Sequence, residues 1–378
     1  MSRRANIINN VISILLVLAG LFAVVYLANV TFGGNMFITV LLFLAGSIVA
    51  GLINAFVHEW GHIIAGKING FTLLSYTVWF FNWTKRKGKL YFSLVMIGEE
   101  AGYTEMVATS TDNLAKRFSR QTLGGIIASF IMMLIGIVPI ALLKILPYEA
   151  YCFLAMFFPI GIYYFVNNAL PMSAGGVKND GGVIYGIKKG DDNSKVVLSL
   201  LAIQSQILNG KTPGEIEEGY YFNLPQLPED DLYFSILLNS RYCYYLDRGD
   251  FENAKKVASR EEMLAENMPK SVRAQFLLDA LYGYCTFNFN EDKADEIMYD
   301  CERFLNKVNT CTTIRVKMAY MVYVLKDKTG LDTFYEKGLK ECRRTALVGL
   351  GAFEKKLLDK IKIDGDLLED SNLEQTEN

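Results

Sequence analysis

The sequence has little of three things: histidine, net charge and paired cysteine. Its 378 residues include two histidines, and its 38 lysines and arginines nearly balance its 40 aspartates and glutamates, for a formal net charge of -2. That balance gives no indication of nucleic-acid binding. The six cysteines contain no Cys-x-x-Cys pair, and five lie in the polar second half, so we expect reduced thiols.

Apolar residues are abundant and unevenly distributed. They make up 51% of the chain and form long runs up to about residue 180, after which the sequence becomes charged and helical in pattern. The change in composition predicts a mostly α protein in two domains. We expect a membrane-embedded domain at residues 1–190, a cytosolic helical domain at residues 191–363 and a disordered acidic tail at residues 364–378.

Four apolar segments are long enough to cross a bilayer, which takes about 20 residues. They are residues 8–30, 36–66, 121–145 and 151–170. Arg3 and Arg4 precede the first segment as in a signal peptide, but its length and the lack of a small-x-small cleavage site favour a retained anchor.

The basic residues predict how these segments are oriented. They precede the first segment and fill the loop between the second and third, whereas the connectors at residues 31–35 and 146–150 contain none. Because basic loops stay in the cytosol, we expect a multi-pass protein, in a bacterial cell membrane, with both termini cytosolic. His62 would then lie near the cytosolic end of its span.

Both histidines belong to one motif, His58-Glu59-Trp60-Gly61-His62. Residues four apart share a face of a helix, so the two imidazoles can bind one Zn²⁺, and Glu59 can act as general base toward a water on the metal. The alternative is a hydrogen-bonded pair in the core. The apolar surroundings favour the metal, because ionisable groups beside a membrane segment are costly to keep without a function.

Two histidines leave the metal one protein ligand short. Asp180 is the candidate, because it follows a segment that Pro171 and several glycines would break, at the end of the fourth apolar run. Irregular backbone at membrane depth is tolerated where it lines a cavity. The other reading of Asp180 is a helix N-cap.

Residues 70–106 differ from their apolar surroundings. Residues 71–80 and 90–97 are rich in β-branched and aromatic residues, and a basic turn at residues 85–89 separates them. The pattern predicts a small membrane-associated sheet. It is either a packed lid or a surface whose edge binds an extended peptide by strand addition.

Taken together, these motifs resemble the site-2 protease family of intramembrane zinc metalloproteases. Four elements carry the resemblance, in the family's order: the His58–His62 motif, residues 96–106, residues 124–129, and Asn168-Ala169-Leu170-Pro171 followed by Asp180-Gly181. It covers about residues 36–185. Three departures are a longer loop between the asparagine and the aspartate, Ser129 in place of a usual Asn and Ile126 in place of a usual Pro, the last two read as packing changes.

The resemblance implies that His58, His62 and Asp180 bind zinc and that Glu59 activates water. It also implies that Asn168 positions the substrate backbone. The expected function is hydrolysis of peptide bonds in membrane-anchored substrates, either in regulated intramembrane proteolysis or in processing of a peptide precursor.

The second half shows helix pairs that begin about 40 residues apart, near residues 231, 271 and 311. Residues 248–254 resemble the turn into the second helix of a tetratricopeptide repeat. Such helix pairs stack into binding surfaces for proteins, but an ordinary helical bundle is the equal alternative. The expected partners are a membrane-spanning protein or peptide substrate, membrane lipid and a protein at the helical domain.

Two other functions are open. One is an inactive adaptor that acts through the helical domain, although an adaptor does not need His58, Glu59 and His62 intact. The other is a different membrane zinc peptidase with a glutamate as third ligand.

Overall fold

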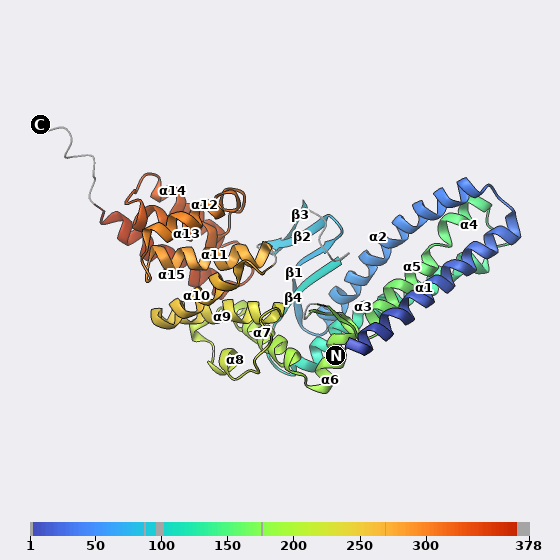
Figure 1. Ribbon diagram of the computed structural model, residues 1–378, viewed down its shortest axis with the longest axis horizontal. Coiled ribbons are helices and arrows are strands. Elements are labelled where there is room, and N and C mark those ends of the chain that lie inside the picture. The colour runs from blue at the N-terminus through green and yellow to red at the C-terminus, as the bar shows by residue number, and fades with distance from the viewer. Residues whose placement is uncertain (1–2, 87, 96–101, 175–176, 269, 369–378) are drawn as a thin grey trace, which may run out of the picture. The chain divides into compact units, whose positions relative to one another are not determined.

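A computed structural model describes residues 3–86, 88–95, 102–174, 177–268 and 270–368 of the chain (Figure 1). The chain divides into two compact units, Met1–Leu198 and Ser199–Asn378. The division falls within one helix, α7 (Asp192–Leu208), eight residues beyond the boundary expected at residue 190.

Long apolar helices dominate the first unit. They are α1 (Arg3–Phe32), α2 (Met36–Ile68), α3 (Leu114–Ala141), α4 (Tyr148–Leu154) and α5 (Phe157–Ala169). With α4 and α5 counted together, the described residues contain four helical segments that are long and apolar enough to cross a membrane, in agreement with the predicted number. The third begins at Leu114 rather than at residue 121, because its first two turns are helical but too polar to read as a span.

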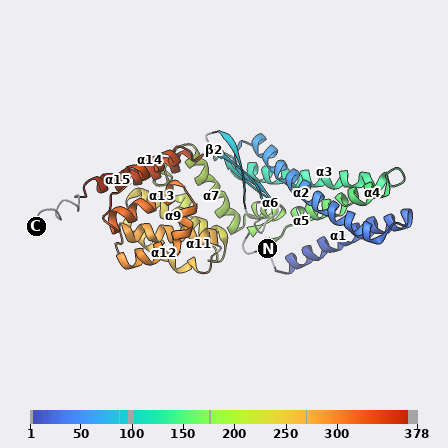
Figure 2. The ribbon, with the colours of Figure 1, turned by 90° about the horizontal axis from the view of Figure 1, so that it is seen from above.

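Glycines let these helices approach closely. Gly61 of α2 faces Gly124 of α3, and a methyl group on either would collide with the other's backbone. Small residues at such contacts are how apolar helices pack in lipid, where burial of apolar surface drives no association. The contact lies within the histidine motif, so it holds α3 directly beside both histidines. Helices α3 and α5 pack together as well (Figure 2).

A four-stranded antiparallel sheet follows α2. Its strands are β1 (Phe71–Val78), β2 (Phe81–Arg86), β3 (Lys89–Leu94) and β4 (Gly102–Ala108), in the order β3-β2-β1-β4. The expected small sheet is confirmed, and it contains two strands, β2 and β4, besides those in the two predicted runs. Trp79 adopts a left-handed conformation with φ 53°, so the chain reverses direction six residues before the turn expected at residue 85. The residues that follow form β2. Residues 96–101, which carry part of the family resemblance, lie outside the described residues.

The segment expected to be a loop after α5 contains a short hairpin. Strands β5 (Ser173–Ala174) and β6 (Val177–Lys178) pair, and α6 (Asp180–Lys189) begins two residues later. Asp180 is therefore the first residue of a helix rather than its cap, which is Asn179.

The second unit is helical throughout its described part. Its elements after α7 are η1 (Pro213–Glu215), α8 (Gly219–Phe222), α9 (Leu232–Arg248), α10 (Phe251–Ala265), α11 (Lys270–Cys285), α12 (Glu291–Lys307), α13 (Cys311–Ala319), η2 (Tyr320–Val324), α14 (Leu331–Cys342) and α15 (Val348–Asp366). Side-chain caps begin α9, α10, α12 and α13, and Gly249 ends α9 with φ 71°. Helices adjacent in sequence pack together, as α9 with α10 and α11 with α12. Helix α15 continues to Asp366, and residues 369–378 of the expected tail lie outside the described residues.

Candidate metal centre

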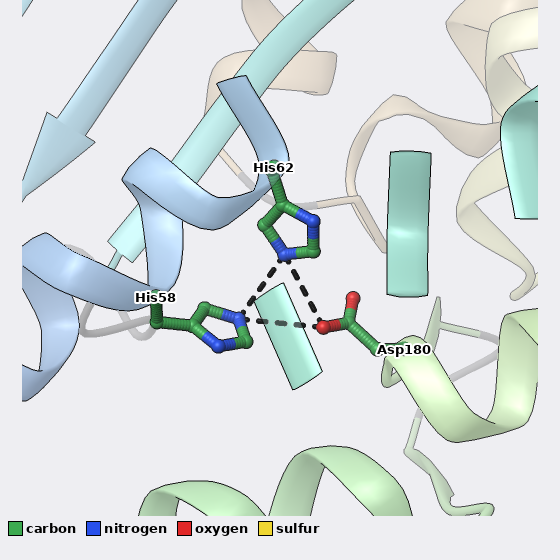
Figure 3. A group of neighbouring side chains, drawn as sticks. All are labelled: His58, His62 and Asp180. Carbon is green, nitrogen blue, oxygen red and sulfur yellow. Dashed lines mark hydrogen bonds and ion pairs between the residues drawn. The ribbon is translucent and has the colours of Figure 1, made fainter. Parts of the chain in front are cut away.

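Two imidazoles from one face of α2 and a carboxylate from α6 meet at one point (Figure 3). The Nε2 atoms of His58 and His62 are 3.1 Å apart. Asp180 Oδ2 lies 3.4 Å from His58 Nε2 and 3.2 Å from His62 Nε2. The three residues named from the sequence as metal ligands thus come together, although 118 residues separate the second from the third.

The hydrogen bonds at Nδ1 of each imidazole determine whether Nε2, which faces Asp180, carries a proton or a lone pair. His58 Nδ1 lies 3.1 Å from Gly125 O and 2.8 Å from Ser129 Oγ, and His62 Nδ1 lies 3.2 Å from Gln121 O. A carbonyl oxygen can only accept, so each Nδ1 carries the proton. Each Nε2 then presents a lone pair toward Asp180, in the pattern typical of metal-ligating histidines.

The result is a cluster of acceptors with no donor. Asp180 Oδ2 is buried and receives no hydrogen bond from the described residues, and it faces the two Nε2 lone pairs. Buried acceptors this close together repel one another unless a cation lies between them. Tetrahedral zinc with bonds of about 2.0–2.1 Å would hold its ligand atoms about 3.3–3.4 Å apart, close to the three distances found here. The residues present therefore fit a divalent cation.

Gly125 shows how tightly the imidazoles are enclosed. A methyl group at this position would collide with the rings of both His58 and His62. Helix α3 can therefore approach α2 this closely, and its carbonyls can reach both Nδ1 atoms, only because the residue is glycine.

Glu59 lies beside the cluster and beneath the sheet. It is 5% exposed, and Thr104 Oγ1 of β4 donates a hydrogen bond of 2.5 Å to its Oε2. Strand β4 passes so close that a side chain at Gly102 would overlap the Glu59 carboxylate. The edge strand of the sheet thus lies against the one carboxylate of the motif.

Asn179 holds the backbone that carries Asp180. Its Oδ1 accepts from Gly182 N–H at 2.9 Å and Met172 N–H at 2.8 Å, and its Nδ2 donates to Leu170 O at 2.7 Å. This one amide caps α6 and ties it to the end of α5, which fixes the direction in which Asp180 points.

Helix α1 supports the same loop from the other side. Asn9 Nδ2 donates to Pro171 O at 2.7 Å, and Asn6 exchanges hydrogen bonds with the backbone of Ser173. In an apolar environment such bonds have few competitors. Polar side chains in the first two turns of α1 therefore position a loop more than 160 residues away.

Asn168 is not part of the cluster. Its Nδ2 donates to Tyr164 O one turn back in α5, 2.9 Å away. In contrast, three residues that sequence reasoning did not assign to the site take part in it: Ser129, Thr104 and Asn179. The sequence favours a packing change at Ser129, but this residue follows Gln121 by eight residues and Gly125 by four, so the helical period places it on their face.

Comparisons with protein-family models, with curated proteins and with solved structures find no match for this chain.

Proposed function

We propose that the chain is an intramembrane zinc metalloendopeptidase, similar to the site-2 proteases, that hydrolyses a peptide bond in a membrane-anchored substrate. The observation that carries this proposal is the convergence of three buried acceptors with Glu59 beside them. His58, His62 and Asp180 would hold the ion, which leaves a position open for water or substrate, as in catalytic zinc sites.

Zinc would supply the Lewis acidity that polarises a substrate carbonyl and lowers the pKa of a water molecule. The other steps belong to the chain. Glu59 is adjacent in sequence to one proposed ligand and buried next to the others, so its carboxylate can take a proton from the attacking water. The same carboxylate would pass that proton to the departing amine. Thr104, through its bond to Oε2, holds the carboxylate in one orientation.

The substrate must reach the site as extended chain, because the carbonyls of an intact membrane helix are engaged in its own hydrogen bonds. Strand β4 pairs on one side with β1 and forms the edge of the sheet, and it contacts Glu59. We propose that a locally unwound substrate pairs with this edge, which would align its backbone along the site.

We propose that both termini and the helical unit lie in the cytosol of a bacterial cell, the orientation that the distribution of basic residues favours. The pairs α9–α10, α11–α12 and α13–α14 begin at Leu232, Lys270 and Cys311. The succession of helix pairs, with residues 248–254 at the turn between α9 and α10, supports a tetratricopeptide-like arrangement that binds a substrate or regulator, although the spacing is longer than the roughly 34 residues typical of that repeat.

A cleavage assay tests the proposal. A reporter with one apolar segment, interrupted by a helix-breaking Asn-Pro pair, would be coexpressed with the wild-type chain, with Glu59→Gln and with Glu149→Gln as the control. We expect Glu59→Gln to reduce cleavage by about 10³-fold or more while zinc content is unchanged, and Glu149→Gln to leave both unchanged. Equal cleavage by the Glu59→Gln chain would overturn the proposal.

A further inference from the structure

A second site lies within the helical unit, apart from the proposed metal centre. A groove of about 1010 Å³ opens between the ends of α9 and α11, the start of α10, η2 and α15. Its volume is at the upper limit for small-ligand pockets, so it can hold a short segment of chain. None of the residues that line it belongs to the hydrolytic site, and its occupation does not depend on the proposed peptidase activity.

Aromatic rings form the apolar part of the groove. Phe251 stacks on Phe287 with centroids 5.5 Å apart and an interplanar angle of 15°. Phe251 is 41% exposed and Phe289 is 56% exposed. Large rings left open on the wall of a groove, rather than scattered over a surface, mark a place where another molecule binds.

Cations lie over these rings. Lys360 Nζ is 5.5 Å from the centre of the Phe251 ring, and Lys326 Nζ is 5.9 Å from that of Phe289. Arg248 lies over Tyr244 in the same way, at 5.4 Å. Among the described residues, none of these three cations forms an ion pair. A ring face positions a cation while leaving its donors available to an incoming anion.

The acidic residues of the groove are mostly engaged elsewhere. Asp247 is buried, accepts from Gly214 N–H at 2.8 Å and pairs with Lys356 at 3.0 Å. Asp364 accepts from the hydroxyl of Tyr323 at 2.5 Å. Glu252 is the third acidic residue. The groove is therefore lined by four basic and three acidic side chains, of which two acidic ones already have donors.

This balance is unlike that of the unit as a whole. Residues 199–378 contain 23 lysines and arginines against 31 aspartates and glutamates, a formal net charge of -8. An acidic unit with a local excess of positive charge in one groove attracts anions to that groove and repels them elsewhere.

We propose that the groove binds an acidic peptide segment of a partner protein. Carboxylates of the segment would pair with Lys326 and Lys360, and its apolar side chains would pack on Phe251 and Phe289. A groove with both aromatic and cationic side chains prefers such a segment to a purely apolar or a purely acidic one. Only a segment with both kinds of side chain can contact the rings and the lysines at the same time.

Fluorescence anisotropy of the detergent-solubilised full chain tests this proposal. The probe is a fluorescein-labelled ten-residue peptide of alternating Glu and Leu or Phe, and its control is the same peptide with Gln in place of Glu. We expect the acidic peptide to bind at least tenfold more tightly than the Gln peptide, and its affinity to fall as salt is raised.

Charge reversal then locates the binding. Lys326→Glu with Lys360→Glu should weaken binding at least tenfold, and so should Phe289→Ser, whereas Lys307→Glu with Lys340→Glu, on exposed lysines outside the groove, should not. Equal binding by all variants, or by both peptides, would overturn the proposal. A chain that ends at residue 368 and binds at least tenfold more tightly than the full chain would also overturn it, since the acidic tail would then be the occupant.

Discussion

The two units both bury charged side chains but satisfy them by different means. In the first unit, His58, His62 and Asp180 present only acceptors to one another. In the second, Arg315 and Glu354 are each 2% exposed and form an ion pair of 2.7 Å, and Arg315 also covers the ring of Tyr282. Opposite charges complete each other without a further partner, whereas a set of acceptors needs one.

A second cluster in the helical unit sharpens this contrast. Glu261 and Asp279 are like-charged and almost fully buried. Burial, and next the neighbouring Asp279 carboxylate, raise the pKa of Glu261 well above its usual range, and burial raises the pKa of Asp279 to about 7. Protonation therefore relieves this acidic pair, whereas the two histidines with Asp180 are arranged for a metal ion. Buried polar side chains alone do not indicate a binding site. A site is indicated when the buried groups lack a hydrogen-bond donor or cation that a ligand could supply.

The largest effect on stability is expected from a substitution that breaks the buried ion pair between Arg315 and Glu354. Arg315→Ala leaves Glu354 buried with the hydroxyl of Thr312 as its only donor among the described residues, and it should lower the free energy of unfolding of the helical unit by about 3–5 kcal/mol. Denaturant titration followed by circular dichroism measures the loss, with exposed Arg343→Ala as the control. A change below about 1 kcal/mol would mean that the pair is not the internal support described here.

A smaller effect is expected from the protonated pair. Because the pKa of Glu261 is higher in the folded than in the unfolded chain, folding takes up a proton, and the free energy of unfolding falls as pH rises above about 4.3. Glu261→Gln removes the contribution of Glu261 to that fall, so the variant should be more stable than the wild type at pH 8 and almost unchanged at pH 4. Denaturant titrations at both pH values measure this, with exposed Glu266→Gln as the control. The same gain at both pH values would contradict a proton on Glu261.

The smallest effect concerns the position of the base in the first unit. Thr104→Val removes the hydrogen bond to Glu59 with little change in volume. It should lower the rate of reporter cleavage about tenfold, which corresponds to an activation free energy higher by about 1.4 kcal/mol. Zinc content should not change, and Thr104→Ser should restore the rate. If the Ser variant is as slow as the Val variant, Thr104 acts through packing and not through its hydroxyl.

The sequence predicts what is local. The four-residue spacing places His58 and His62 on one helix face. The lengths of the apolar runs give the number of candidate membrane spans, because a helix rises by a constant length per residue. Apart from Asp180 with the two histidines, it does not predict which side chains meet across the fold. Asn168 was chosen by position in a motif, whereas Asn179 ties the loop through four backbone groups, a role that only the folded chain displays. Strand β2 was missed because a left-handed Trp79 has no turn signature.

Metal content tests the central claim most directly. Elemental analysis would be made on the detergent-purified wild type, His58→Ala, Asp180→Ala and Glu59→Gln, each after reconstitution with zinc. We expect one zinc per chain in the wild type and in Glu59→Gln, and none in the other two. Zinc retained by Asp180→Ala would contradict the assignment of the third ligand, and a wild type without zinc would contradict the metal centre itself.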